Sequence, residues 1–278
     1  MKGSFGFLLI ICLLATFGCA EKGIPKERYS QFSMKKSHVM DGNNLTVKLE
    51  NPLMCPIRIW LSSDHPSIKP TVESLSPILL EEKKDTTLIF SDLKDFKDDI
   101  GYHIVMGNPE KEIIQTPIEL PFPKSKSYTI IQGNNSNYTH NSDYSRYAID
   151  FNLKVKDTVT SVSDGYVVGV IDQYQHGGKD EKWKPFGNFI TIYNPDSGLF
   201  FQYVHLTYQG SLVKVGDQVK SGQAIGLSGM TGQTDVAHLH FNSLIPIKGK
   251  EGIRSYPIEF KEGYQGKALK KGDIVKKE

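Results

Sequence analysis

Residues 203–241 read YVHLTYQGSLVKVGDQVKSGQAIGLSGMTGQTDVAHLHF, and this stretch decides the fold of the C-terminal half of the chain. Short apolar runs at 199–205, 224–227 and 238–244 alternate with polar residues and are separated by glycine-rich turns. Period-two alternation with frequent glycine is typical of strands joined by turns, and no segment shows a sustained helical period. The stretch therefore predicts an all-β domain.

The same pattern continues on both sides of this stretch. Asp164-Gly165 is a hairpin signal between two apolar runs. Residues 172–185 are polar and contain glycine, which predicts a surface loop. We place the β-domain at 126–260, and we expect residues 261–278, rich in lysine and poor in apolar side chains, to form a solvated tail.

Residues 28–123 predict a separate β-rich domain. Leu45, Val47 and Leu49 alternate with polar residues, and a second alternating run follows Pro52. Short strands between turns favour an N-terminal β-sandwich of immunoglobulin-like character, with the domain boundary near Pro123. Four isolated histidines outside the stretch quoted above are interpreted as surface or packing residues and not as ligands: His38, His65, His103 and His176.

Residues 1–20 resemble an export segment, because Lys2 is followed by an apolar run and then by small residues. The residues before Cys19 resemble a loose lipobox, which predicts a lipid-modified cysteine; cleavage after Ala20 is the alternative. We therefore expect an exported protein of the cell envelope, in contact with the membrane only through this anchor. Cys12 lies in the apolar run and Cys19 at the processing site, so Cys55 is left alone in the body of the mature protein, which excludes a disulfide framework and favours a small buried hydrophobe.

The net charge of +2 gives no sign of a nucleic-acid partner. Any partner or substrate must therefore be inferred from a site. Oligomeric state has no signature in the sequence.

Candidate chemistry begins with His238-Leu239-His240. In a strand, both imidazoles project from the same face. Such a pair is weak evidence for a metal by itself, but His205 ends another alternating run and Asp150 lies among apolar neighbours. A carboxylate in that setting is costly to bury unless it is paired or bound to a metal. Two imidazoles and one carboxylate would leave the fourth position of a tetrahedral zinc ion open to water.

At this point the sequence resembles the lysostaphin/LytM-type zinc metallopeptidases. The resemblance rests on the motif around His205, on residues 213–226, on Gly229-Met230-Thr231-Gly232 and on residues 238–241, and it covers about 132–244. It implies a C-terminal antiparallel β-sheet peptidase domain, a Zn²⁺ cofactor and peptidoglycan peptides as substrates.

The sequence departs from this family at one position. The family's first motif usually reads His-x-x-x-Asp, but the residue four before Asp150 is Arg146, which cannot bind a cation. His140 lies ten residues before Asp150, and related sequences look similar in carrying a histidine there. The turn-rich residues 141–143 could return His140 to the carboxylate.

The resemblance then implies a role for each residue. His140, Asp150 and His240, through either ring nitrogen, would bind zinc with water as the fourth ligand. His238 would be the general base, and His205 would hydrogen-bond the oxyanion of the tetrahedral intermediate. The leading alternative is a degenerate, non-catalytic LytM-like domain that binds cell wall or activates a separate amidase. A purely structural envelope lipoprotein would leave these polar residues unexplained.

Overall fold

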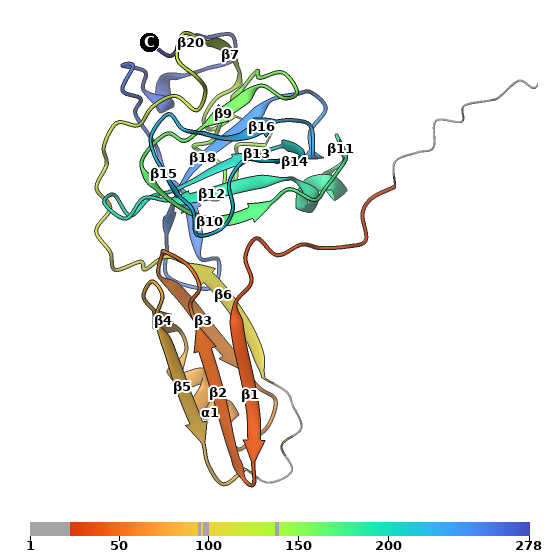
Figure 1. The fold of residues 1–278 in the computed structure, drawn as a ribbon, viewed down its shortest axis with the longest axis vertical. Coiled ribbons are helices and arrows are strands. Elements are labelled where there is room, and N and C mark those ends of the chain that lie inside the picture. The colour runs from red at the N-terminus through yellow and green to blue at the C-terminus, as the bar shows by residue number, and fades with distance from the viewer. Residues whose placement is uncertain (1–22, 94–95, 97–99, 137–138) are drawn as a thin grey trace, which may run out of the picture.

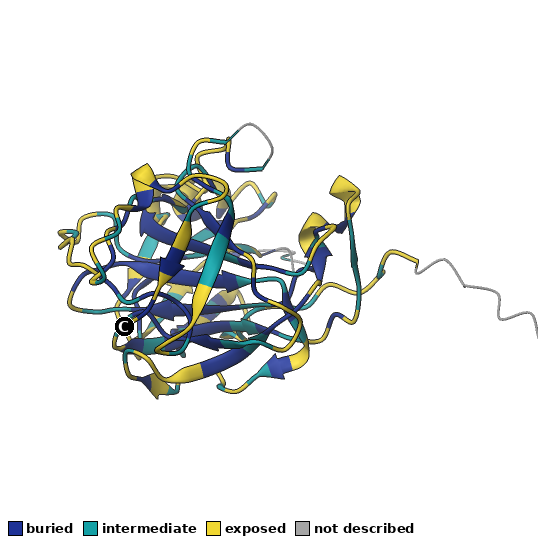
Figure 2. Cartoon of the chain, turned by 90° about the horizontal axis from the view of Figure 1, so that it is seen from above, coloured by how far each residue is buried: buried dark blue, intermediate teal, exposed yellow. Residues whose placement is uncertain are grey.

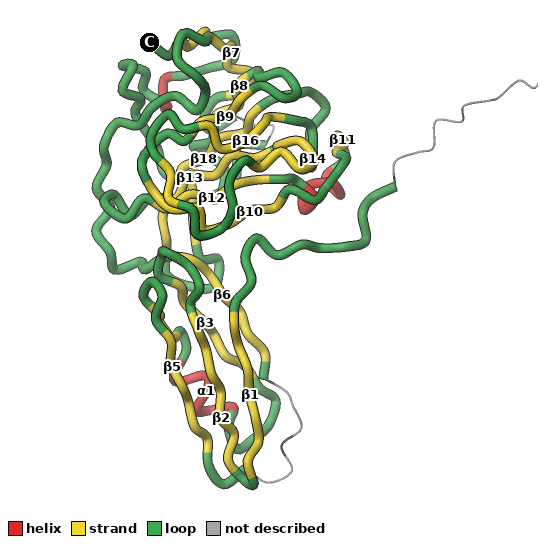
Figure 3. The backbone as a smooth tube through the Cα atoms, in the orientation of Figure 1, coloured by secondary structure: helices red, strands yellow, loops and turns green. Residues whose placement is uncertain are grey.

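The computed structural model describes residues 23–278 except 94–95, 97–99 and 137–138 (Figure 1). The expected export segment 1–20, with Cys12 and Cys19, lies outside the described residues. The all-β prediction is confirmed, since the described helical segments are short and strands dominate both halves (Figure 3). No helix among the described residues is long and apolar enough to cross a membrane.

The N-terminal strands form two antiparallel sheets with a shared core. One sheet has the order β1-β2-β5 and the other β4-β3-β6. Their bounds are β1 Lys35–Asp41, β2 Asn44–Glu50, β3 Ile57–Ser62, β4 Ile78–Leu80, β5 Asp85–Phe90 and β6 Gly101–Met106, with the short helix α1 at Lys69–Leu75. Leu45, Val47 and Leu49 on β2 point into the core, as their alternation predicts. Cys55 is buried in the same cluster as a free thiol, which confirms its interpretation as a small hydrophobe.

The C-terminal half is built on a large sheet. Among the described residues nine strands form it, with the order β15-β10-β12-β13-β18-β8-β7-β20 and with β19 paired to β18. Their bounds are β7 Ser127–Gln132, β8 Ile149–Phe151, β10 Gly165–Ile171, β12 Phe189–Tyr193, β13 Phe200–Val204, β15 Gln218–Val219, β18 Leu239–Pro246, β19 Ile253–Ser255 and β20 Ile274–Lys276. A smaller sheet, β14-β16-β9, uses Leu206–Ser211, Ala224–Ser228 and Thr158–Thr160. Apolar side chains from both sheets meet in one core, visible as buried strands in Figure 2.

The central strands β12, β13 and β18 each have one side chain in two pointing into that core. Ile192, Phe201 and Phe241 lie there, and the residues between them in sequence occupy the opposite face of the sheet. That opposite face carries the candidate site described below.

Residues 172–185 are more structured than the surface loop expected from their composition. They contain strand β11 (Gly177–Gly178), which pairs with β17 (Gly232–Gln233), and most of the 3-10 helix η1 (Glu181–Phe186). Tyr174, Trp183 and Phe186 form a small buried cluster with Ile171. The polar majority of the segment concealed this cluster, because three aromatic rings supply enough apolar area to hold it against the domain.

Residues 261–278 do not form the solvated tail that we expected. Strand β20 pairs with β7 at the edge of the large sheet, and Val275 is fully buried. Lys277 is 2% exposed, and its Nζ donates to the Leu120 carbonyl and pairs with Glu119 Oε2 at 2.9 Å. The lysine-rich composition misled the prediction because alternate residues of a short strand can be buried while the lysines between them stay in water.

The two halves are joined by a buried contact. Arg58 on β3 is 3% exposed, and its guanidinium donates to the carbonyls of Gly107, Ile247 and Gly252. Burial lowers the pKa of Arg58. The N-terminal core cluster also includes Tyr193, Phe200 and Leu244 of the large sheet. The N-terminal domain is therefore packed onto one end of that sheet, as seen in Figure 1.

Candidate metal centre

Asp150 and His240 face each other because of strand register. Asp150 lies on β8, and its Cα partner on the neighbouring strand β18 is His240. Asp150 Oδ1 and His240 Nδ1 are 2.9 Å apart. Of the two ring nitrogens of His240 that the sequence left open as donors, Nδ1 is therefore the one that faces the carboxylate.

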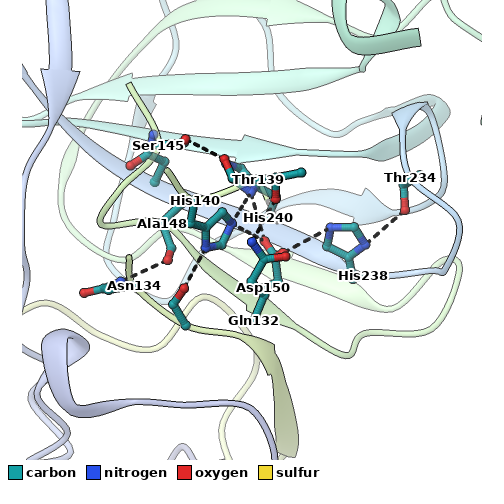
Figure 4. Close-up of polar contacts among 12 residues, drawn as sticks. Gln132, Asn134, Thr139, His140, Ser145, Ala148, Asp150, Thr234, His238 and His240 are labelled. Carbon is teal, nitrogen blue, oxygen red and sulfur yellow. Dashed lines mark hydrogen bonds and ion pairs between the residues drawn. The ribbon is translucent and has the colours of Figure 1, made fainter. Parts of the chain in front are cut away.

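His140 reaches the same point from a loop that follows β7. Its ring is fully buried, with Nε2 3.2 Å from His240 Nδ1 and 3.3 Å from Asp150 Oδ1 (Figure 4). Nδ1 lies 2.9 Å from the Gly133 carbonyl oxygen. Because a carbonyl can only accept, Nδ1 carries a proton, and in its neutral form the ring presents an unprotonated Nε2 to the cluster.

Gly133 allows this loop to pack closely. A Cβ at that position would lie 2.1 Å from the Leu269 carbonyl oxygen, so any larger residue would displace the segment whose carbonyl orients His140.

The cluster perturbs the pKa values of its members. Burial opposes the charged form of Asp150, but the neighbouring histidines outweigh it and hold the pKa of this carboxyl well below its ordinary value. Burial likewise opposes a proton on His140, yet the Asp150 carboxylate raises its pKa overall. For His240 burial is stronger than the attraction of Asp150, and its pKa is lowered.

His238 lies beside this cluster and immediately before β18. Its Nε2 is 3.8 Å from Asp150 Oδ2. Its Nδ1 is 3.0 Å from the Val236 carbonyl and 3.2 Å from Thr234 Oγ1, as Figure 4 shows for Thr234. The carbonyl fixes the proton on Nδ1, so Nε2 faces the cluster with a free lone pair. The ring is oriented to accept a proton there.

His205 follows β13, with a positive φ of 66°. Its ring centroid lies 4.6 Å from that of His238 and 5.9 Å from that of His240. Its Nδ1 lies 2.7 Å from the Thr231 carbonyl oxygen. Burial, together with the two neighbouring histidines, lowers the pKa of His205 to about 3. The neutral ring therefore also presents a lone pair at Nε2, and it can donate to an oxyanion only after it has received a proton.

The structure thus brings together all five residues that the sequence analysis selected. His140, Asp150 and His240 offer donor atoms that all lie within 4.8 Å of one another, and this is the one such group of three or more found among the described residues. Arg146, at the family's usual histidine position, instead pairs with Asp143 on the surface.

Sequence reasoning missed the groups that orient the rings. The carbonyls of Gly133, Val236 and Thr231 hold His140, His238 and His205. A backbone carbonyl leaves no trace in residue type, so only the turn-forming residues around Thr231 and Thr234 hinted that the backbone bends there.

Asn188 was also missed. It is fully buried, its Nδ2 donates to the Tyr174 carbonyl, and its backbone N–H donates to Thr231 Oγ1. Thr231 Oγ1 in turn donates to the Leu206 carbonyl, next to His205. The signal available in the sequence was a polar residue directly before the apolar run 189–193.

Part of the chain matches known proteins in sequence. Residues 144–251 match peptidase family M23. A protein of Buchnera aphidicola described as an uncharacterized metalloprotease is 33% identical over 132 residues, which cover 46% of this chain and 32% of that protein. The glycyl-glycine endopeptidase ALE-1 of Staphylococcus capitis is 38% identical over 98 residues, covering 35% of this chain and 24% of that protein.

Among solved structures, the catalytic domain of lysostaphin from Staphylococcus simulans is 27% identical, covers 47% of this chain and 88% of that chain, and has a TM-score of 0.34. The matched part of this chain spans about a quarter to a third of the length of the two curated relatives named above.

Proposed function

We propose, from the membership of residues 144–251 in the lysostaphin/LytM (M23) family of peptidases, that the chain is a zinc endopeptidase acting on bacterial cell-wall peptidoglycan. The observation that carries the proposal is the buried cluster of His140, Asp150 and His240.

The donor set suits a zinc ion. Donor atoms about 2.0–2.1 Å from a tetrahedral zinc ion lie about 3.3 Å apart. The three distances among His140 Nε2, Asp150 Oδ1 and His240 Nδ1 are 3.2, 3.3 and 2.9 Å. Two neutral imidazoles with one carboxylate also match the ligand types of catalytic zinc sites, which keep one position open.

When bound, the metal would supply Lewis acidity that polarises the scissile carbonyl and acidifies a water molecule. His238 can take a proton at Nε2, because its Nδ1 proton is held by Val236. We propose that His205 hydrogen-bonds the oxyanion, whose negative charge would favour a second proton on this ring while Nδ1 still donates to the Thr231 carbonyl.

The alternative, a degenerate domain that binds cell wall or activates an amidase, is not favoured. Loss of the metal site would be expected in such a domain, whereas here His140 supplies a third donor despite the Arg146 replacement. A purified protein that binds no zinc and cleaves no cell wall would support this degenerate-domain alternative.

Further parts of the proposal concern the rest of the chain. We propose an immunoglobulin-like character for the N-terminal sheets, with domains at 28–123 and 126–260, and export to the cell envelope with lipid attachment at Cys19 (residues 1–20). Mass spectrometry of the mature N-terminus tests the last point, since an unmodified Glu21 would exclude lipidation. Analytical ultracentrifugation of the mature protein would give its oligomeric state.

The central test combines zinc content with cleavage. The purified full chain should contain one zinc ion per molecule and should release soluble peptides from isolated cell walls, with both properties lost on chelation and restored by zinc. His176→Ala is a suitable control, because it removes a histidine outside the cluster. A chain that binds no zinc even after supplementation would overturn the proposal.

A further inference from the structure

The face of the large sheet that carries His240 changes character along its strands. The Cα partners across β12, β13 and β18 define three rows. The first row is Phe189, Val204 and His240; the second is Thr191, Gln202 and Asn242; the third is Tyr193, Phe200 and Leu244. Successive rows on one face lie about 7 Å apart, because each strand rises about 3.4 Å per residue.

The third row is covered by the N-terminal domain. Tyr193, Phe200 and Leu244 are at most 3% exposed and belong to the N-terminal core cluster. A Cβ on Gly107, which follows β6, would lie 2.7 Å from Pro246 Cβ, so the two domains meet closely here. The part of this sheet face that is open to a ligand therefore ends at the third row, directly after the polar second row.

One cleft connects the metal centre to this covered end. Its lining includes Asp150 and His240, then Thr191 and Gln202 of the second row, and finally Met106. Met106 is the last residue of β6 and is itself part of the N-terminal core cluster. The N-terminal domain thus forms the end wall of the cleft that begins at the candidate catalytic residues.

The second row offers polar groups without protein partners. Thr191 is fully buried, and its Oγ1 has no hydrogen-bond partner among the described residues. Gln202 Oε1 accepts from the Tyr144 hydroxyl at 2.8 Å, which leaves the Nε2 hydrogens for another acceptor. A buried hydroxyl that lacks a partner is costly, and this cost is removed when a ligand supplies one.

We propose that Thr191 and Gln202 hold the C-terminal end of a short peptide substrate, and that the N-terminal domain limits how far the substrate extends beyond the cut bond. The inference rests on the proposed function. The groups that can bind a ligand are the Thr191 hydroxyl and the Gln202 amide N–H, since Gln202 Oε1 already accepts a hydrogen bond from Tyr144. The Gln202 amide N–H can only donate, so it suits an oxygen acceptor, either a terminal carboxylate or a last peptide carbonyl, and the Thr191 hydroxyl can donate to the same group.

The distance sets the length of substrate. About 7 Å separates the row of His240 from that of Thr191, and about 14 Å separates it from the covered row. An extended peptide advances about 3.3–3.6 Å per residue, so about two residues reach the row of Thr191 and about four reach the covered row. The chain should therefore cut close to the C-terminal end of a peptide and not in the middle of a long one.

The test uses the zinc-loaded full chain. Wild-type protein is first incubated with isolated cell walls, and the cut bond is identified by mass spectrometry. Synthetic peptides containing that bond are then lengthened by one or by four residues on either side. Four added residues on the C-terminal side should lower kcat/KM by about tenfold or more, as expected for loss of at least one good hydrogen bond. The same addition on the N-terminal side should have a much smaller effect.

Two further comparisons test the Thr191 hydroxyl and identify the substrate group that it binds. Thr191→Val should raise KM for the short peptide about tenfold while kcat and zinc content stay unchanged. Thr87→Val, on an exposed position of β5, is the matched control. A free acid preferred over its amide would identify a terminal carboxylate as the bound group, and equal rates would identify a peptide carbonyl.

The outcomes are distinguishable. Absence of release from cell walls by zinc-loaded wild type would overturn the proposed function and this inference with it. Release combined with indifference to C-terminal length, or with an unchanged KM in Thr191→Val, would overturn the inference alone.

Discussion

Two halves of the metal centre are held by different kinds of structure. Asp150 and His240 are paired residues on adjacent strands, and their side chains meet because the register of β8 and β18 puts them opposite each other. His140 belongs to a loop, and its Nδ1 donates to the Gly133 carbonyl. The strand-held pair is therefore fixed by the fold itself, whereas the loop-held ligand can be replaced or moved in evolution without altering the sheet.

The largest expected effect comes from the strand-held half. Asp150→Asn keeps the size of the side chain but removes the negative charge that both histidines contact. We expect zinc to be lost and cleavage to fall to background, because a neutral amide is a poor zinc ligand. Zinc analysis and release of peptides from cell walls measure both effects, with circular dichroism as the control for folding. Retention of one zinc ion per chain would show that His140 and His240 suffice.

The next prediction concerns His140, the ligand held by the loop, and tests whether it differs from the pair held by the strands. His140→Ala should also abolish stoichiometric zinc, since only two donors of the group remain. In the wild type, chelation should increase amide hydrogen exchange in the segment 139–148 more than in β8 and β18. Equal changes in the loop and the strands would contradict the distinction drawn between the two halves.

His238→Ala should separate chemistry from metal binding. Its Nε2 lies 3.8 Å from Asp150 Oδ2, outside the group of three donors. Most of the zinc should therefore remain, while cleavage falls by about 10²–10⁴-fold, as expected for loss of a general base. Zinc content and cleavage rate together decide whether His238 is a general base or a ligand. If this variant loses its zinc as well as its activity, His238 is a ligand.

The smallest effect is expected far from the metal, at the edge strand β20. Burial opposes the charged form of Glu119, but Lys277 and the Ser221 hydroxyl outweigh it and lower its pKa below the ordinary value of 4.5. A carboxyl with a depressed folded-state pKa stabilises the fold above its unfolded pKa, and this contribution is lost as the pH falls through the folded value.

Glu119→Gln should therefore lower stability at pH 7 by about 1 kcal/mol or less, and the difference from wild type should shrink below about pH 4.5. Denaturant unfolding at several pH values measures it. Such a variant should leave zinc content unchanged, which shows that edge pairing and the metal centre are independent. A difference that grew towards acid pH would have the wrong sign for this pair.

The sequence could predict the strand-held half of the site better than the loop-held half. The spacing of His238-Leu239-His240 predicts that both rings lie on one face of a strand. The apolar neighbours of Asp150 predict a buried carboxylate. His140 could be proposed only through resemblance and the turn residues after it. Nothing in residue types indicates that the Gly133 carbonyl orients its ring.

The fold shows the same division. Alternation predicted the strands of both domains, yet it could not show that β20 joins the large sheet, because three residues carry too short a pattern. Nor could it show that Arg58 is buried between the domains, because arginine is usually a surface residue. Long-range contacts of this kind depend on where distant segments meet, which local patterns do not encode.

Cys55 gives the molecule a built-in reporter. It is the one cysteine among the described residues, it is fully buried, and it lies in the cluster that also contains Phe200 and Leu244 of the large sheet. Burial also raises the pKa of its thiol well above the ordinary value, so a thiol-specific reagent can react only when this cluster opens. The rate of alkylation of Cys55 therefore reports opening of this shared cluster, without any added label and separately from changes at His140, Asp150 and His240.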